Sequence, residues 1–140
     1  MAPGAEKLMC STRQEMMEAV RKGKADAAGG QPGTTNLGAF APLTDLLKNF
    51  YNNGGRIAAI CAAPTVFAQI GLLHGKKATA YPSCMDGLGD AVRLEDNVVV
   101  DGNITTSRGL GTAIDFSLSL ISQLLGQEKA DQIAESVVYK

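Results

Sequence analysis

The chain has 140 residues, of which 45% are hydrophobic and 19% charged, and its formal net charge is −1 at pH 7. This length suits one domain with a buried core, and we expect residues 1–140 to form a single domain. The balanced charge gives no reason to expect binding to nucleic acid, and no apolar run approaches the ~20 residues that cross a membrane. The first ten residues lack the features of a secretory signal, so we expect a cytoplasmic protein, with the nucleus or mitochondrion as further compartments.

The first 36 residues differ from the rest of the chain. "STRQEMMEAVRKGK" (11–24) predicts a helix, because Thr12 and Glu15 can form a capping box. Its apolar stripe consists of Met16, Ala19 and Val20. No segment before it is typical of a strand, and "ADAAGGQPGTTN" (25–36) indicates a glycine-rich loop. Since a parallel sheet needs strands rich in Val, Ile and Leu, this part of the chain lacks a segment suited to such a strand.

The middle of the chain alternates between helical and strand patterns. Residues 40–53 predict a helix that ends at Gly54 and Gly55. Its apolar stripe consists of Leu43, Leu46, Leu47 and Phe50. "RIAAI" (56–60) predicts a buried strand, "APTVFAQIGLL" (63–73) a second helix and "KKATAYP" (76–82) a short strand.

The C-terminal part begins with a hairpin pattern. In "NVVVDGNITTS" (97–107), Asp101 and Gly102 lie between two β-rich runs and favour a tight turn. "GTAIDFSLSLISQLLG" (111–126) predicts a helix, and a last short helix is expected around residues 128–136. The apolar residues of the first of these recur at Ile114, Leu118, Ile121 and Leu125. Strands that alternate with helices predict an α/β layer fold with a largely parallel sheet.

The three cysteines, Cys10, Cys61 and Cys84, form neither a disulfide framework nor a metal-ligand pattern. We therefore interpret each as a free thiol in a reducing compartment and predict no metal site. Cys10, near a predicted helix cap, and Cys84, in the predicted loop "PSCMDGLG" (82–89), are interpreted as incidental thiols. The single histidine, His74, lies in a glycine-flanked connection and is interpreted as a solvated loop residue.

Cys61 lies between a predicted strand and a helix that begins near Pro64. A thiol in such a turn faces the unpaired N–H groups of the helix start, which favour the reactive thiolate. The same position also suits a small buried side chain, and the local pattern alone favours packing over reactivity.

Further segments carry a resemblance to a known family. "GGQPGTTNL", "RIAAICAAPTV", "GLLHGKKATAYPS", "VVVDGNITTSRGLGTAIDFSLSLI" and "GQEKADQIA" resemble the DJ-1 branch of the ThiJ/PfpI superfamily over about residues 26–138. The resemblance implies a flavodoxin-like (Rossmann-like) three-layer α/β sandwich, usually a homodimer, in which the N-terminal strands are missing or reduced here. It also implies a cofactor-free glyoxalase or deglycase that acts on dicarbonyls such as methylglyoxal and glyoxal, or on glycated proteins, and protects against oxidative stress.

The resemblance assigns the nucleophile to Cys61. Backbone N–H groups of Gly29, Gly30 and Ala62 would form an oxyanion hole. The glycine pair is equally typical of a simple turn.

The resemblance also places Arg108 and Tyr81 beside the substrate. The pattern around Arg108 suits a solvated cap or an ion pair equally well. Tyr81 stands where the family often has histidine.

The acidic partner departs from the family pattern. "APGAE" places Glu6 at the first acidic position, which makes it a candidate general base, whereas Met9 occupies the position of the family's conserved glutamate. We therefore expect a weaker nucleophile and lowered or lost catalysis.

Three other interpretations remain open. The second-ranked one is a non-catalytic redox sensor or chaperone-like protein in which Cys61 is oxidised to sulfenate and then sulfinate. A cysteine amidase or protease ranks lower, because no histidine directly follows Cys61. An inactive deletion product is the fourth interpretation.

Overall fold

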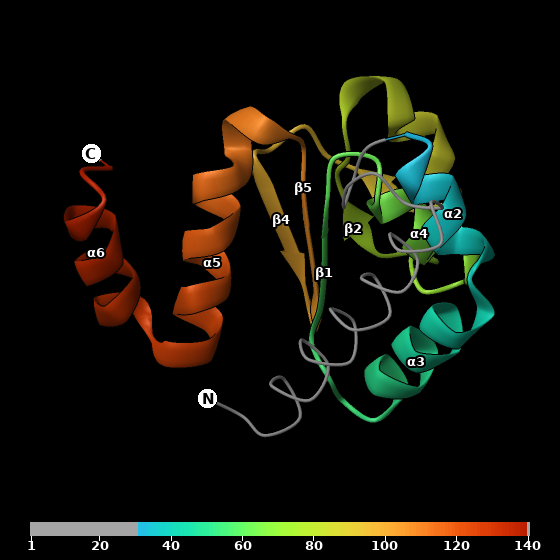
Figure 1. Ribbon diagram of the computed structural model, residues 1–140, viewed down its shortest axis with the longest axis horizontal. Helices are drawn as coiled ribbons and strands as arrows, with labels where there is room; N and C mark the ends of the chain where they lie inside the picture. The colour runs from blue at the N-terminus through green and yellow to red at the C-terminus, as the bar shows by residue number, and fades with distance from the viewer. Residues whose placement is uncertain (1–30, 140) are drawn as a thin grey trace.

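A computed structural model describes residues 31–139 of the chain (Figure 1). The helices are α2 (Gly33–Ala39), α3 (Ala41–Asn52), α4 (Pro64–Gln69), α5 (Ala113–Leu125) and α6 (Gln127–Ser136), and the short 3₁₀ turns are η1 (Pro82–Leu88) and η2 (Leu110–Thr112). The strands are β1 (Ile57–Ile60), β2 (Lys77–Ala78), β3 (Val92–Arg93), β4 (Val98–Asp101) and β5 (Ile104–Ser107).

The main sheet has the strand order β1-β5-β4. The central strand, β5, runs parallel to β1, with Ile57 opposite Ile104, and antiparallel to β4. The turn between β4 and β5 has Gly102 at a φ of +58°, a conformation that glycine adopts without strain, so the predicted hairpin is confirmed. The short strands β2 and β3 form a separate parallel pair. The expected α/β fold with largely parallel pairing is therefore confirmed for the described residues.

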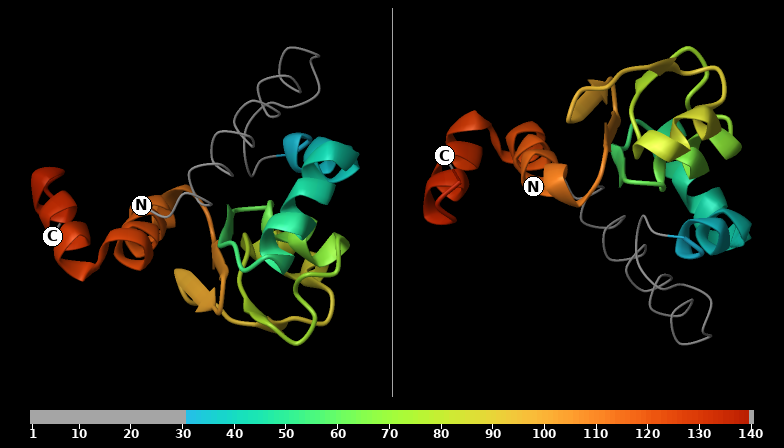
Figure 2. Two further views of the ribbon diagram at one scale, coloured as in Figure 1. Left: turned by 90° about the horizontal axis from the view of Figure 1, so that it is seen from below. Right: turned by 90° about the horizontal axis from the view of Figure 1, so that it is seen from above.

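The main sheet lies between two helical layers (Figures 1 and 2). On one side α5 packs against β4 and β5, and α6 packs on α5; on the other side, α3 and α4 lie against β1. The apolar core fills the space between the sheet and the second layer, where α2 joins α3 and α4. Its larger members are Leu37, Leu43, Leu47, Ile57, Val66, Phe67, Leu73, Leu88 and Ile104. By contrast, no residue of α5 is fully buried, and Ile114 and Leu125 at its ends are about half exposed.

Two segments predicted as loops are helical. Residues 33–36 were expected in a glycine-rich loop but form the start of α2, because Leu37 buries its side chain in the core and Pro32 suits a helix start. The segment around Cys84 is not a loop but the 3₁₀ turn η1, which begins at Pro82, and its Leu88 is fully buried. In both cases tertiary packing overrides the local preference.

Two elements are shorter than predicted. Helix α4 stops at Gln69, since Gly71 takes a φ of +81° and reverses the chain. Strand β2 stops at Ala78 because the N–H of Thr79 donates to the side-chain Oγ1 of Thr106, 3.0 Å away, and not to a backbone carbonyl.

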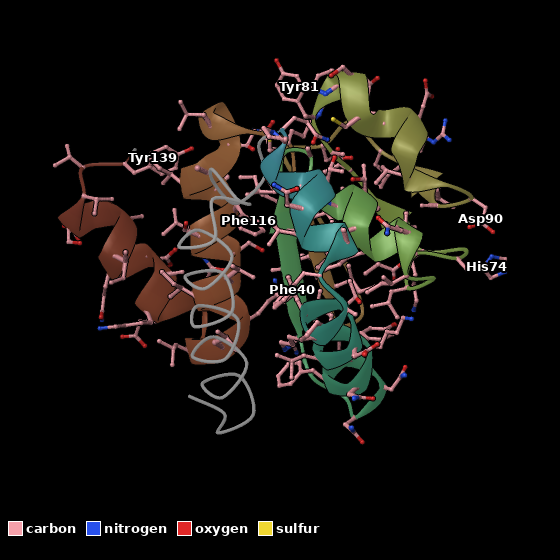
Figure 3. All side chains as sticks on the ribbon, turned by 45° about the vertical axis from the view of Figure 1, so that its right-hand side comes forward. Phe40, His74, Tyr81, Asp90, Phe116 and Tyr139 are labelled. Carbon is pink, nitrogen blue, oxygen red and sulfur yellow. The ribbon has the colours of Figure 1, made fainter. Side chains whose placement is uncertain are left out.

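His74 is exposed, as predicted, but its Nδ1 also pairs with the carboxylate of Asp90 (Figure 3). Within residues 31–139, no helix combines the length and the apolar character needed to cross a membrane. Two predictions concern residues outside the described part of the chain: the helix at 11–24, and the absence or reduction of the N-terminal strands.

A candidate nucleophile site around Cys61

Cys61 lies in the sharp turn between β1 and α4. Its φ is +66°, in the left-handed region that residues with a side chain rarely adopt. The turn is closed by the N–H of Ala63, which donates to the carbonyl of Ile60 at 3.2 Å, and Pro64 then begins the helix. The thiol is therefore presented at the carboxyl end of a parallel strand, where ligands of open α/β sheets bind.

Two hydrogen bonds hold this turn from opposite sides. The N–H of Cys61 donates to the carbonyl of Ser107 at 3.1 Å, and the carbonyl of Cys61 accepts from the N–H of Tyr81 at 2.9 Å. Since Arg108 directly follows Ser107, the structure brings the backbones of Cys61, Tyr81 and Arg108 together. The residue Cys61 itself is partly buried.

Ala62 is 3% exposed. Its N–H forms no hydrogen bond within the described part of the chain. An unpaired N–H beside the thiol is the arrangement that an oxyanion hole requires. The predicted donors Gly29 and Gly30 and the candidate base Glu6 lie outside the described residues.

Tyr81 presents an accessible ring beside this turn. The residue is 48% exposed and lies where η1 begins (Figure 3). A Cβ at Gly109 would lie 3.5 Å from Cδ2 of the Tyr81 ring, so the ring lies close to the backbone that follows Arg108. Its position at the rim leaves the ring free to contact a bound molecule.

Arg108 is neither a free solvated side chain nor part of an ion pair with any described residue. Its Nε donates to the carbonyl of Ala80 and its Nη1 to the carbonyl of Glu95, each at 3.3 Å. These bonds use two of the five N–H donors of the guanidinium, and within residues 31–139 the others have no hydrogen-bond partner and can face an anionic group. The side chain thus ties the end of β5 to the segment that leads into Tyr81.

Sequence reasoning missed the polar residues that fix the end of β5. Ser107 is fully buried; its hydroxyl donates to the carbonyl of Asn97 at 2.6 Å and lies 2.7 Å from Oγ1 of Thr112. Thr112 Oγ1 also accepts from the N–H groups of Arg108 and Gly109. Consecutive hydroxyl residues at the end of an otherwise buried strand were the available signal, because such groups are buried only when they are hydrogen-bonded.

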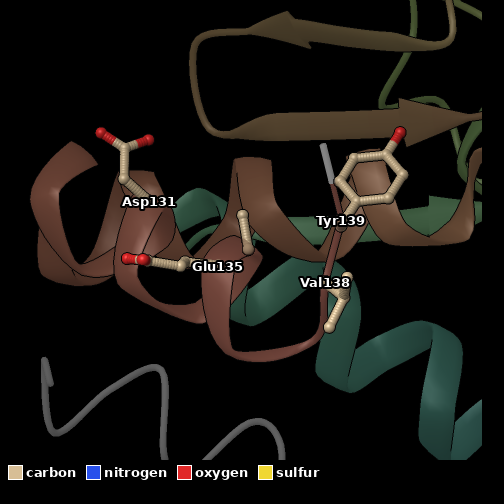
Figure 4. A pocket seen from close by; sticks show the side chains of 5 residues that line it. Asp131, Glu135, Val138 and Tyr139 are labelled. Atoms are coloured by element: carbon tan, nitrogen blue, oxygen red, sulfur yellow. The ribbon is translucent and has the colours of Figure 1, made fainter.

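An open pocket of about 560 Å³ lies at the C-terminal end of α6 (Figure 4). Its described lining includes Asp131, Glu135, Val138 and Tyr139, and none of Cys61, Ala62, Tyr81 and Arg108 contributes to it. This pocket therefore plays no part in the candidate site.

The chain is similar in sequence and in fold to known proteins. Residues 12–123 match the model of the DJ-1/PfpI family. Protein dj-1beta of Drosophila melanogaster is 43% identical over 112 residues, which are 79% of this chain and 60% of that protein. The glutathione-independent glyoxalase DJR-1.2 of Caenorhabditis elegans is 36% identical over 106 residues, 74% of this chain and 56% of that protein.

Solved structures show the same fold. The crystal structure of Drosophila melanogaster DJ-1beta superposes with a TM-score of 0.77 at 42% identity and covers 80% of this chain and 61% of that one. The oxidized DJ-1 of Toxoplasma gondii gives a TM-score of 0.76 at 44% identity, with 79% and 61% covered. These relatives share the expected flavodoxin-like α/β fold, although this chain spans less than two thirds of their length. The chain belongs to the DJ-1/PfpI family.

Proposed function

We propose that the protein is a cofactor-free glyoxalase- or deglycase-type enzyme that converts small dicarbonyls with Cys61 as its nucleophile. The observation that carries the proposal is the left-handed turn at Cys61, held by hydrogen bonds from Tyr81 and to Ser107. Strain of this kind is found where a side chain must be presented for chemistry. The glyoxalase named among the relatives supports the same reaction class.

The proposed reaction converts methylglyoxal and water into lactate. The thiolate of Cys61 adds to the aldehyde carbon, so that a C–S bond forms and the C=O electron pair moves to oxygen. A base then removes the proton from that carbon, and the resulting enediolate is protonated at the neighbouring carbon to give a thioester. Water finally cleaves the C–S bond, which releases lactate and restores the thiol.

The chain's residues have distinct roles in this proposal. The N–H of Ala62, which has no hydrogen-bond partner among the described residues, stabilises the oxygen that gains negative charge, and Gly29 and Gly30 are proposed as further donors. Arg108 offers its remaining guanidinium N–H groups, and Tyr81 covers the substrate with its exposed ring. Glu6 is proposed as the group that moves the proton.

The decisive experiment compares lactate formation from methylglyoxal by the parent and by Cys61→Ala. We expect turnover in the parent and none in the variant. The matched control is Cys84→Ala, because Cys84 is a second partly buried free thiol, in η1. Equal turnover in the parent and Cys61→Ala, or none in the parent, would exclude the proposed enzyme.

The second candidate is a redox sensor in which a hydroperoxide oxidises Cys61 to sulfenate and then sulfinate. The partly buried thiol lies beside the Ala62 N–H, which no described residue pairs with, and this favours the candidate because that N–H can bind a sulfinate oxygen. We expect mass spectrometry after mild peroxide treatment to locate added oxygen on Cys61 before Cys84. Earlier oxidation of Cys84 would exclude this role. For either role we propose a cytoplasmic homodimer.

A further inference from the structure

Among the residues that the structure describes, one edge of strand β1 is unpaired. Within residues 31–139, β1 pairs only with β5, and no strand lies along its other side. The N–H of Ile57 donates to Asn103 at 2.8 Å and that of Cys61 to Ser107, so both face β5. Because successive residues of a strand point their N–H groups in opposite directions, those of Ala58 and Ile60 face the open edge. The short sequence IAAI carries no charge or proline to protect that edge.

An apolar cavity of about 230 Å³ lies along this edge. Leu43 and Leu47 of α3 form part of one wall, Ala58 and Ile60 of β1 lie at its base, and Phe116 of α5 closes the other side. Figure 3 shows Phe116 on the side of α5 that faces α2 and α3. All ten described residues that line the cavity are apolar. We refer to this cavity and the adjoining β1 edge as the interlayer groove.

We propose that the interlayer groove binds an extended, uncharged, apolar segment of another polypeptide, which pairs with β1 as an additional strand. The open backbone groups of Ala58 and Ile60 require a partner with alternating donors and acceptors, which an extended peptide supplies and an apolar small molecule lacks. Since helical layers flank the groove on both faces, both faces of the segment must be apolar, as in a buried parallel strand.

A single extended segment fits this groove better than a second copy of the chain. In a second copy the β1 edge lies inside that copy's own groove, between Leu43 and Leu47 of α3 and Phe116 of α5, and it is therefore not exposed as a flat edge that could pair with β1 of the first copy. The uncharged lining likewise disfavours a charged segment, because a buried charge without a partner is strongly destabilised.

The first test uses a fluorescent Val/Ile-rich peptide with lysines at both ends, added to the full chain and followed by polarisation. Two control peptides carry N-methyl groups at alternate residues. In one frame the methylated residues are the odd-numbered ones, and in the other frame they are the even-numbered ones. We expect one frame to abolish binding and the other to preserve it, because only one set of N–H groups faces β1. Equal binding of both frames, or no binding of the parent peptide, would overturn the proposal.

Hydrogen exchange locates the bound peptide. We expect amide exchange at Ala58 and Ile60 to slow by about tenfold or more on peptide addition, with little change at Ile57, which already bonds within the sheet. Protection of Ala58 and Ile60 in the free chain would show that the groove is already filled and would overturn the proposal. If that protection from exchange increases with protein concentration, the occupant of the groove is a second copy of the chain.

A matched pair of variants on α5 tests the wall of the groove. Phe116→Glu places a charge in the groove, whereas Ile114→Glu places one on the same helix at a residue that is 47% exposed and does not line the groove. We expect peptide affinity to fall about tenfold or more in Phe116→Glu only, with both variants folded by circular dichroism. Equal affinities in two folded variants would contradict the proposed site.

Discussion

The left-handed conformation of Cys61 leads to an unusual prediction about glycine. Cys61→Ala keeps the Cβ that makes a φ of +66° unfavourable, whereas Cys61→Gly removes it. The relief is about 1–2 kcal/mol, and the extra backbone freedom of glycine in the unfolded chain offsets ~0.5–1 kcal/mol of it. We therefore expect the glycine variant to be more stable than the alanine variant by about 1 kcal/mol, or roughly 4 °C in Tm for a chain of this length.

The control for this comparison lies two residues along the chain. Ala63 has a φ of −61° in the right-handed helical region, so Ala63→Gly in the Cys61→Ala background relieves no strain. It should lower stability by about 0.5–1 kcal/mol. Urea unfolding of the three proteins measures both effects. Glycine at position 61 could instead lower the free energy of unfolding, relative to Cys61→Ala, as much as glycine at position 63 does. In that case the turn does not hold the thiol of Cys61 in a strained conformation, and the observation that carries the proposed function is lost.

Two further predictions concern hydrogen bonds away from the thiol. Thr106→Val keeps the side-chain shape but leaves the fully buried N–H of Thr79 without its acceptor, so unfolding in urea should show a loss of about 1–3 kcal/mol. Thr35→Val, on the exposed face of α2, should change stability by less than ~0.5 kcal/mol, and equal losses would contradict this account. The hydroxyl of Tyr139 donates to Asp115 at 2.6 Å, and this bond raises the pKa of Tyr139 above its usual value, with smaller contributions from desolvation and the Asp115 charge. The stabilisation by this hydrogen bond is therefore fully present below about pH 10, and it is lost as the pH rises through the higher pKa of the folded state. The parent should be more stable than Tyr139→Phe, and this difference in unfolding free energy should shrink above about pH 10. A difference that grows with pH would contradict the assignment.

The sequence predicted the elements whose patterns are local. Strand β1 and its turn into α4 follow from an apolar run, a cysteine and a proline, and the hairpin follows from Asp101 and Gly102. Helix α2 was missed because its residues have weak helical preference and are helical only through the burial of Leu37. Its stability depends on contacts with α3 and α4, which no local pattern encodes.

The place of Cys61 in the fold was predictable from the sequence, but the hydrogen bonds around it were not. The position of Cys61 in the turn could be inferred from the sequence, but its positive φ could not, since a cysteine carries no signal for that conformation. The role of Arg108 as a clamp on the carbonyls of Ala80 and Glu95 depends on segments that meet only in the fold. A charged side chain in a sequence indicates a charged partner first, and here the partners are uncharged carbonyl groups.

The arrangement around Cys61 separates two chemical requirements. Formation of a C–S bond needs a presented thiol and a donor for the developing oxyanion, and we propose that the β1 turn and the Ala62 N–H supply them. Completion of the reaction also needs proton transfer between two carbons, and Met9 stands where the resemblance leads us to expect a glutamate. We therefore expect covalent addition of a dicarbonyl to Cys61 to be better preserved than turnover. An adduct that forms readily and is converted slowly is the behaviour we expect of a chain that keeps the presenting turn and relies on Glu6, with Met9 at the second acidic position.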